Sequence, residues 1–463
     1  MYCGFITTLK NVRKHPNADK LMLAECYDNT VCVGLNSAEG EIGVYFPTDG
    51  QLSEEFCKQH DLVRRKDENG NPAGGYLDPE KRNIKAVKLR GEKSDGLFMP
   101  LSCLVYTGVN LDDLDIGTQI TVVNGHEICQ KYIPKSNSRS AHSGGGAGNR
   151  TRKHKDPVAP LFAEHADTEQ LVYNLSAFKP GDEIEITLKM HGTSQRTGHL
   201  PILQGYKKTF WEKITRKDGT PIYGWGGISG TRRVVLEDYE GGFYGNNEFR
   251  EQHSKTFEGK LMKGETVYYE VVGFTTTGQP IMATASNKKL NDKEFIKRYG
   301  EETVFSYGCD PEGTDKGHYE DIVWVGPQSD IYVYRMTMTN EDGFVVEYTP
   351  DFMRYRCEQM GVKTVPVLWK GTIPEHCFYA TVEGQTELTP GEWIKTVAEQ
   401  YYDGHDPIGK THVREGVVVR IINRPKFTAY KHKNFSFKVL EGIIKDTATA
   451  PDMEEAQEVE NNA

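Results

Sequence analysis

Residues 183–193 read Glu-Ile-Glu-Ile-Thr-Leu-Lys-Met-His-Gly-Thr, a segment in which apolar and polar side chains alternate. This alternation is typical of a β-strand with one buried face. It places the two isoleucines and the leucine on the buried face and Lys189 on the other, where a ligand can reach it. Gly192 follows at a position that permits a turn and a close approach of the backbone to a phosphate. We therefore expect a strand that ends in a reactive lysine.

A nucleophilic lysine must lose a proton, because an ammonium group has no lone pair, and burial or neighbouring cations favour that loss. The spacing K-x-x-G is by itself a weak signal. It recurs at Lys88 and Lys93, and such a lysine is usually a surface residue near a turn. Lys189 differs in the ordered segments that follow it: Tyr269-Glu270-Val271-Val272-Gly273, Tyr332-Val333-Tyr334-Arg335, Arg414-Glu415-Gly416-Val417-Val418-Val419-Arg420 and Tyr430-Lys431-His432-Lys433.

This ordered set resembles motifs I, III, IIIa, IV and V of the covalent nucleotidyltransferases, the superfamily of ligases and capping enzymes. The pattern Lys-x-His-Gly-Thr at Lys189 is similar to the RNA ligases rather than to capping enzymes or most DNA ligases. Segments 15–21 (His-Pro-Asn-Ala-Asp-Lys-Leu) and 88–97 resemble the OB domain that precedes the ligase core in Deinococcus-type RNA ligases. The resemblance covers most of residues 1–445 outside the linker, and it implies an ATP-dependent RNA ligase.

The resemblance also implies roles for single residues. Lys189 would attack the α-phosphorus of ATP and carry AMP as a phosphoramidate. Glu270 would contact the ribose or a metal-bound water, and Glu415 would be the main carboxylate of a Mg²⁺ or Mn²⁺ site. Tyr334 would stack on adenine, although a core position is the alternative because Tyr332 lies on the same face.

Phosphate contacts are expected from cationic side chains. Arg232 and Arg233 have planar donor groups suited to phosphate, and the sequence leaves the choice between them open. Lys431 and Lys433 share one face of a strand and would neutralise the triphosphate and later the AMP phosphate, with Lys438 as a rival for the second role. A further candidate, His191, is either structural or active in sealing.

Four regions follow from the distribution of residue types. Residues 1–125 contain short strands between turns and predict an OB-like β-barrel that binds nucleic acid. Residues 126–160 form a Gly/Ser-rich basic segment, which we expect to be a flexible tether or an arm that touches phosphates. Residues 161–445 mix strands and helices and predict an α+β nucleotidyltransferase domain. Residues 446–463 form an acidic tail that we expect to be disordered.

Whole-chain composition limits the remaining choices. The net charge of −10 hides local basic patches, since six acids and no bases follow Lys445. No apolar run reaches the roughly 18 residues of a membrane helix, and the N-terminus lacks the pattern of a secretory signal. The nine scattered cysteines favour a reducing cytoplasm. We expect the partner to be RNA, or an RNA-containing duplex with a 5′-phosphate end. The alternatives are a general polynucleotide or DNA ligase and a tRNA-binding type of protein without catalysis.

Overall fold

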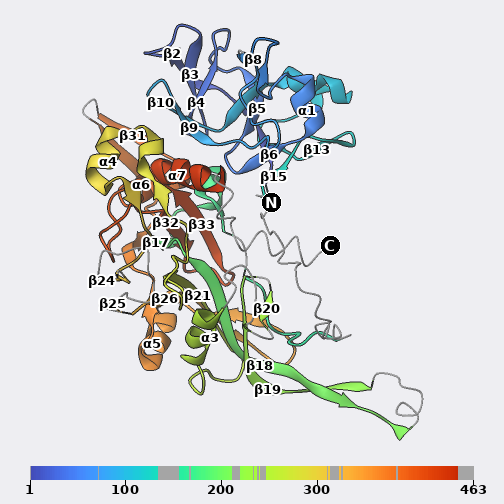
Figure 1. Ribbon diagram of the computed structural model, residues 1–463, viewed down its shortest axis with the longest axis vertical. Helices are drawn as coiled ribbons and strands as arrows, with labels where there is room; N and C mark the ends of the chain where they lie inside the picture. The colour runs from blue at the N-terminus through green and yellow to red at the C-terminus, as the bar shows by residue number, and fades with distance from the viewer. Residues whose placement is uncertain are drawn as a thin grey trace. The chain divides into compact units, whose positions relative to one another are not determined.

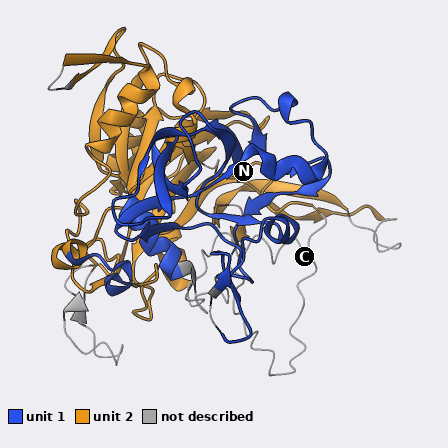
Figure 2. Ribbon diagram, turned by 90° about the horizontal axis from the view of Figure 1, so that it is seen from above, with its two compact units in different colours: residues 1–135, 286–293, 435–452 blue, residues 136–285, 294–434, 453–463 orange. Residues whose placement is uncertain are grey.

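In the computed structural model the chain forms two compact units, which Figure 2 shows in different colours. Unit 1 consists of residues 1–135, 286–293 and 435–452, and unit 2 of the remainder. The structure describes residues 2–446 except 71, 134–155, 166–167, 211–218, 233, 237–238, 240–246, 310, 313–322, 325–326 and 382–383. The expected tail, apart from residue 446, and most of the expected linker lie outside this described part.

Unit 1 consists mainly of short antiparallel strands (Figure 1). Its elements are β1 (Gly4–Thr8), β2 (Lys10–Lys14), β3 (Leu21–Cys26), β4 (Asn29–Gly34), β5 (Ile42–Phe46), β6 (Gly50–Leu52), α1 (Glu54–Gln59), β7 (Arg65–Lys66), β8 (Pro72–Gly74), β9 (Ala86–Leu89), β10 (Glu92–Asp95), β11 (Leu97–Pro100), β12 (Gln119–Ile120), β13 (Val122–Val123), β14 (His126–Glu127), β15 (Cys129–Lys131) and α7 (Phe435–Asp446). Strands β14 and β15 lie beyond residue 125, so ordered structure continues into the expected linker. Hydrogen-bond pairing in the described part gives separate small sheets and does not close them into a barrel.

A motif from the sequence analysis has a structural role in unit 1. The backbone N–H of Asn17 donates to Nδ1 of His15 over 3.1 Å, and this partner assigns the ring hydrogen to Nε2. Nε2 then donates to the carbonyl of Leu89, also over 3.1 Å, and the Asn17 amide donates to the carbonyl of Arg90. The two segments that resemble an OB domain are therefore hydrogen-bonded to each other, although about 70 residues separate them.

Unit 2 is built on two larger sheets, of five and seven strands. Its elements are β16 (Glu169–Gln170), β17 (Glu183–Lys189), β18 (Thr193–Lys207), β19 (Thr220–Gly230), β20 (Val235–Leu236), α3 (Glu248–Lys255), β21 (Glu265–Gly273), β22 (Ala285–Ser286, which ends inside unit 1), α4 (Lys293–Tyr299, which begins there), β23 (Glu302–Thr303), β24 (Pro311–Glu312), β25 (Val323–Trp324), β26 (Ser329–Thr339), β27 (Val345–Glu347), α5 (Pro350–Met360), β28 (Lys363–Thr364), β29 (Val367–Thr372), β30 (Cys377–Thr381), β31 (Gly384–Leu388), α6 (Pro390–Glu399), β32 (Gly416–Ile421) and β33 (Thr428–Lys433). The chain thus has the expected α+β character, rich in sheet and with few helices.

The five-stranded sheet has the order β16-β33-β32-β17-β29 and contains the strand expected around Lys189. Ile184, Ile186 and Leu188 of β17 are buried at 0%, 0% and 1% exposure, as their alternation predicts. They pack with strand β32 and with α6, whose first turn is fixed by a capping box between Thr389 and Glu392. This core holds the end of β17 rigidly. In the described part of the chain, no helix is long and apolar enough to cross a membrane.

Candidate active site

The candidate site begins where three strands of the five-stranded sheet end side by side. Lys189, the last residue of β17, lies opposite Gly416 of β32, which in turn lies opposite Lys433 of β33. Residues directly opposite each other share a face of a sheet, so the two lysines point to the same side. Lys431 lies two residues before Lys433 in β33, opposite Val418, and therefore on the same face of the sheet.

Glu415, immediately before β32, is the centre of this group. Its Oε1 lies 2.7 Å from Nζ of Lys189 and 3.3 Å from Nζ of Lys433, and its side chain is only 2% exposed. Nδ1 of His191 lies 3.5 Å from Oε2, longer than an ordinary hydrogen bond. Burial by itself would raise the pKa of Glu415, but the ammonium groups of Lys189 and Lys433 outweigh it and hold that pKa well below its usual range. Glu415 is therefore a buried carboxylate that stays ionised.

Gly192 connects this cluster to the seven-stranded sheet. A Cβ at Gly192 would lie 2.5 Å from the carbonyl oxygen of Val271 and 2.8 Å from Cγ of Glu270, so only glycine fits against strand β21. Close packing thus requires glycine at this position, where the backbone bends between β17 and β18. The same contact places the Glu270 side chain beside the residue that follows His191.

Tyr334 owes its position to a bulge in strand β26. In the pairing with β21, Tyr268 lies opposite Arg335 and Tyr269 opposite Val333, which leaves Tyr334 as the extra residue. Its hydroxyl lies 3.0 Å from Oγ of Ser194. The Tyr334 side chain is half-buried, whereas Tyr332 is buried at 5% exposure.

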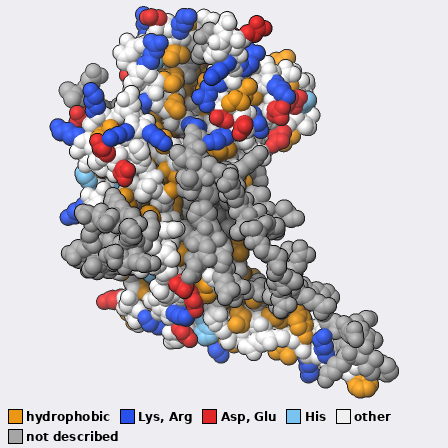
Figure 3. All heavy atoms as spheres, in the orientation of Figure 1, with side chains coloured by type: hydrophobic (Ala, Val, Ile, Leu, Met, Phe, Trp, Pro, Cys, Tyr) orange, Lys and Arg blue, Asp and Glu red, His pale blue; other side chains and the backbone are white. Residues whose placement is uncertain are grey.

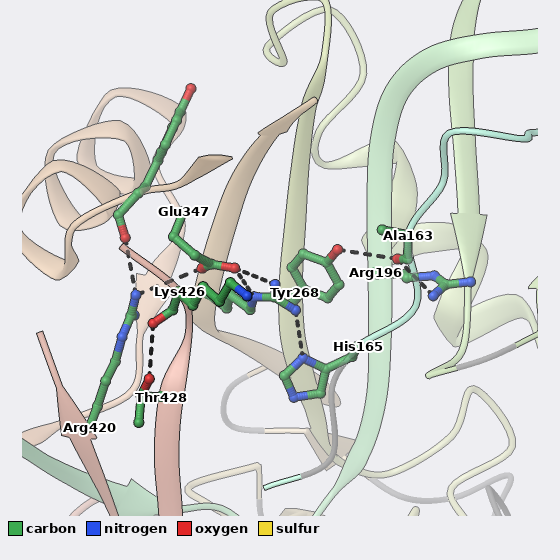
Figure 4. Close-up of polar contacts among 10 residues, drawn as sticks. Ala163, His165, Arg196, Tyr268, Glu347, Arg420, Lys426 and Thr428 are labelled. Atoms are coloured by element: carbon green, nitrogen blue, oxygen red, sulfur yellow. Dashed lines mark hydrogen bonds and ion pairs between the residues drawn. The ribbon is translucent and has the colours of Figure 1, made fainter. Parts of the chain in front are cut away.

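A row of polar side chains continues from Tyr334 across unit 2. The ring of His165 lies 5.1 Å from that of Tyr334, and its Nδ1 accepts a hydrogen bond from Nη1 of Arg335 over 3.3 Å. Arg335 Nε donates to Glu347 Oε1 over 2.8 Å, and Glu347 Oε2 lies 3.8 Å from Nη2 of Arg420. Figure 4 shows this row from Arg420 and Glu347 to His165, and its continuation through Tyr268 to Ala163 and Arg196.

Arg232 lies beside the same row. Its carbonyl accepts hydrogen bonds from Nη1 of Arg196 and from the backbone N–H of His165. Burial, together with the charges of Arg335, Arg232 and Arg196, holds the pKa of His165 well below its usual value. The backbone of Arg232 therefore lies beside His165. Arg233, the other arginine expected to contact phosphate, lies outside the described residues.

Lys433 and Lys438, which the sequence could not separate, have different partners. Lys433 shares Glu415 with Lys189. Lys438 is on α7 in unit 1, where its Nζ lies 2.5 Å from Oδ2 of Asp95. Lys433 is thus the lysine that stands next to the candidate nucleophile.

Several residues of the site carried no signal in the sequence. The hydroxyl of Tyr307 accepts a hydrogen bond from the backbone N–H of His191 over 2.5 Å, and burial raises the pKa of this tyrosine well above its usual value. The charges of Asp406, Glu415 and Glu270 add to that rise. Tyr307, His165 and Arg196 lie in no recognisable spacing with Lys189, so only the fold brings them together.

The acidic residues fit a weakly coordinated divalent cation. The described residues include no group of three or more His, Cys, Asp or Glu side chains that could hold a metal ion. However, Oε2 of Glu415 is buried and has no hydrogen-bond partner within the described part. Mg²⁺ and Mn²⁺ sites that serve phosphate substrates commonly use one or two carboxylates, with waters and phosphate oxygens as the other ligands. Glu415 and Glu270 are suited to such a site.

Comparison with known proteins gives matches only among solved structures. No protein-family model matches the chain, and no curated protein does. A lysine mutant of a Naegleria gruberi RNA ligase with ATP and Mn is 14% identical over 96% of this chain and 99% of that chain, with a TM-score of 0.53. The Naegleria gruberi RNA ligase with pyrophosphate is 15% identical, matches 94% of this chain and 97% of that chain, and has a TM-score of 0.54. A second lysine mutant with ATP and Mn is also 15% identical, matches 96% of this chain and 99% of that chain, and has the same TM-score of 0.54. The chain therefore has the fold of these RNA ligases over nearly its whole length.

Proposed function

We propose that this protein is an ATP-dependent RNA ligase of the covalent nucleotidyltransferase superfamily, similar to the Deinococcus-type enzymes with an N-terminal OB domain. The observation that carries the proposal is the meeting of Lys189, Lys433, His191 and Glu415 at the ends of three strands, in the fold of known RNA ligases. A structural ion pair alone would not need a second lysine and a histidine around one buried carboxylate.

In the first step the amine of Lys189 attacks the α-phosphorus of ATP. A P–N bond forms, the bond between the α-phosphorus and the bridging oxygen breaks, pyrophosphate leaves, and the lysine gives up its proton. Lys433 and Lys431 stand on the same face and would neutralise charge on the phosphates. Tyr334 supports the adenine ring, Arg232 contributes positive charge near it, and Gly192 lets the site pack closely on Glu270.

Two further steps complete the ligation. An oxygen of the 5′-phosphate end attacks the phosphorus of lysyl-AMP, a P–O bond forms, the P–N bond breaks, and the amine of Lys189 is released. The 3′-hydroxyl of the other strand end then attacks the 5′-phosphorus, forms the phosphodiester and expels AMP. A Mg²⁺ or Mn²⁺ ion held by Glu415 and Glu270 would supply charge screening for the departing pyrophosphate. Both ends must be held in line, so a nick in an RNA-containing duplex is the substrate we expect.

The remaining parts of the chain fit this assignment. We propose that unit 1 is an OB-like domain that grips nucleic acid and that residues 126–160 link it to the ligase domain at 161–445. All nine cysteines are free, which suits a cytoplasmic enzyme.

The deciding experiment is covalent labelling of the purified full-length protein with α-labelled ATP. We expect a labelled protein that loses its label when nicked RNA with a 5′-phosphate is added, and no labelling of Lys189→Ala. Lys88→Ala and Lys93→Ala are matched controls, because both lysines have K-x-x-G spacing but lie in unit 1. Labelling of the Lys189→Ala protein would refute the proposal and favour a binding protein without catalysis.

A second experiment separates RNA ligase from general polynucleotide ligase. We expect a nick with RNA at its 3′-hydroxyl end to be sealed at least tenfold faster than the same nick with DNA there, because the 2′-hydroxyl and A-form geometry place the attacking oxygen differently. The measurement is single-turnover sealing of the two nicks by pre-adenylylated protein. Equal rates would assign the chain to the polynucleotide ligases.

A further inference from the structure

Strands β18 and β19 form a long antiparallel arm within unit 2. They pair from Arg196 opposite Gly230 to Lys207 opposite Thr220. The near end packs on Ala159 and Phe162 through Leu200 and neighbouring apolar residues. Beyond the pairing with β21, which ends at Gly198, β18 pairs with no described strand other than β19. Figures 1 and 2 both show the arm extending from the rest of unit 2.

One face of this arm carries a line of aromatic rings. The pairing places Trp225 opposite Pro201, Tyr223 opposite Leu203 and, after an irregularity in β18, Tyr206 opposite Pro221. Alternate residues of β19 and their partners share a face, so Trp225, Tyr223 and Tyr206 lie along the same side. Positions two residues apart on a strand recur at about 6.7 Å. All three aromatic side chains are half-buried, so each ring has part of its surface in solvent.

The charge of the arm is opposite in sign to that of the whole chain. Lys207 and Lys208 are exposed near its outer end, and Nζ of Lys263 lies 5.5 Å from the ring centre of Trp225. Residues 199–210 and 219–230 contain no Asp or Glu, although the net charge of the chain is −10. On the face drawn in Figure 3, hydrophobic and Lys/Arg side chains gather on this arm. Phe210, at 72% exposure, adds another aromatic side chain beyond Lys208.

We infer that this arm is a binding surface for single-stranded RNA next to the ligation site, an inference that rests on the proposed function. Aromatic faces combined with a positive track are the features by which proteins hold single strands without reading sequence, because every base can stack and every phosphate is anionic. Bases stack on Tyr206, Tyr223 and Trp225, and phosphates contact Lys207 and Lys208. The absence of acids from these residues favours a polyanion over a protein partner.

The test measures RNA binding by the full-length protein. A fluorescent single-stranded RNA of about 16 nucleotides is titrated with wild type and with two double variants, Lys207→Glu/Lys208→Glu and Tyr206→Ala/Tyr223→Ala. We expect each to weaken binding roughly tenfold or more, since stacking and phosphate contacts are lost. The lysine double variant should also bind with a shallower dependence on salt. Tyr223→Phe should bind like wild type because it keeps the ring.

Matched controls come from elsewhere in unit 2. Phe210→Ala is compared with Phe344→Ala, because the two side chains are 72% and 71% exposed and only Phe210 follows directly on the lysines of the arm in the sequence. Lys297→Glu on α4 makes, at one position, the charge change that the lysine double variant makes at each of two positions. Both controls should bind RNA like wild type, whereas Phe210→Ala should bind more weakly.

The outcomes separate the arm from the proposed function. Loss of RNA binding with unchanged ATP labelling supports the inference. Wild-type RNA affinity in both double variants overturns it. If these variants keep RNA affinity but change their oligomeric state in ultracentrifugation, the inference is overturned as well, and the arm is a contact between copies of the chain. If no nucleotide labels the wild type but the arm variants still lose RNA binding, the ligase assignment fails and the assignment of the RNA-binding surface holds.

Discussion

The carboxylate of Glu415 is a buried charge held between two cations. Such an ion pair persists only when the partners compensate for lost hydration, and removal of one partner leaves uncompensated charge. In Glu415→Gln, the ammonium groups of Lys189 and Lys433 would face each other without an anion between them, and the candidate metal ligand would be gone. Because the charge on the departing pyrophosphate would then lack the cation that Glu415 would hold, we expect labelling by ATP to fall at least a hundredfold. Single-turnover labelling measures this loss.

Glu185→Gln is the matched control for this change. Glu185 is also 2% exposed and also pairs with a cation, Arg354, at 2.8 Å, but it lies four residues before Lys189 in the same strand. Both variants lose one buried charge, so a general loss of stability would affect both. Labelling by ATP should survive in Glu185→Gln. Excess chelator should abolish labelling of the wild type and of Glu185→Gln alike. Wild-type labelling in Glu415→Gln would contradict the role of this carboxylate.

Sequence reasoning reaches residues that belong to an ordered set of motifs and misses those that only the fold brings near. The spacing around Lys189 and Glu415 is local, so the candidate cluster is foreseeable from motif order. Tyr307 contacts the backbone of His191 although 116 residues separate them in the sequence. The residues around Tyr307 form no pattern that distinguishes them from an ordinary turn. Lys433 belongs to unit 2 and Lys438 to unit 1, because the chain passes from one unit to the other after residue 434. No periodicity in the sequence indicates where this passage occurs, so the sequence cannot choose between the two lysines.

At the level of elements, helix α3 supports the site from behind the seven-stranded sheet. Its Arg250, buried at 3% exposure, donates to the carbonyl of Ser194 and to Oγ1 of Thr193, the residues that follow Gly192. Its His253 lies 2.8 Å from Oγ of Ser329 on β26. The strand around Lys189 was predicted correctly because its alternation is strict. The bulge at Tyr334 was not foreseen, since Tyr332 and Tyr334 share a face in a regular strand.

The burial of His253 predicts a pH dependence of stability. Burial is the main cause that lowers the pKa of His253 to about 4, whereas an unfolded chain has a histidine pKa of about 6.5. Below pH 6.5 the unfolded state takes up a proton that the folded state refuses, so the contribution is full above pH 6.5 and is lost as the pH falls towards 4. The loss amounts to about 3 kcal/mol at most.

The measurement compares apparent Tm at pH 7.5 and pH 5 in wild type and His253→Asn. We expect the apparent Tm of the wild type to fall more between pH 7.5 and pH 5 than that of the variant, because the variant has no side chain to protonate at position 253. His376→Asn is the control, because the side chain of His376 is 73% exposed. An equal drop in all three proteins would show that His253 does not control this transition.

At the scale of the whole molecule, the two units interleave along the chain. Unit 1 contains residues 286–293 and helix α7, both distant in sequence from its strands. Lys88 is ion-paired with Asp292, Lys438 with Asp95, and Nζ of Lys93 lies 5.1 Å from the ring centre of Phe435. Removal of residues 1–155 would strip these partners from residues 286–293 and from α7, so a truncated protein is a poor test of what unit 1 does. Surface substitutions in the full-length protein are the better one.

Unit 1 should therefore be tested through Lys14 and Lys20, two exposed lysines beside the hydrogen-bonded segment at His15 and Asn17. Lysyl adenylation needs only groups of unit 2, so Lys14→Glu/Lys20→Glu should label with ATP at the wild-type rate. Sealing needs a long polyanion held on both sides of the break, and this variant should seal pre-adenylylated nicks several-fold more slowly. The deficit should be smaller at higher salt, because screening weakens the same phosphate contacts in the wild type. Lys58→Glu, on α1 of the same unit, makes half of this charge change at another exposed position and should seal normally if the surface is specific. Equal sealing by all three proteins would leave unit 1 with another task, and a loss of labelling in the double variant would mean that both units are needed for the first step.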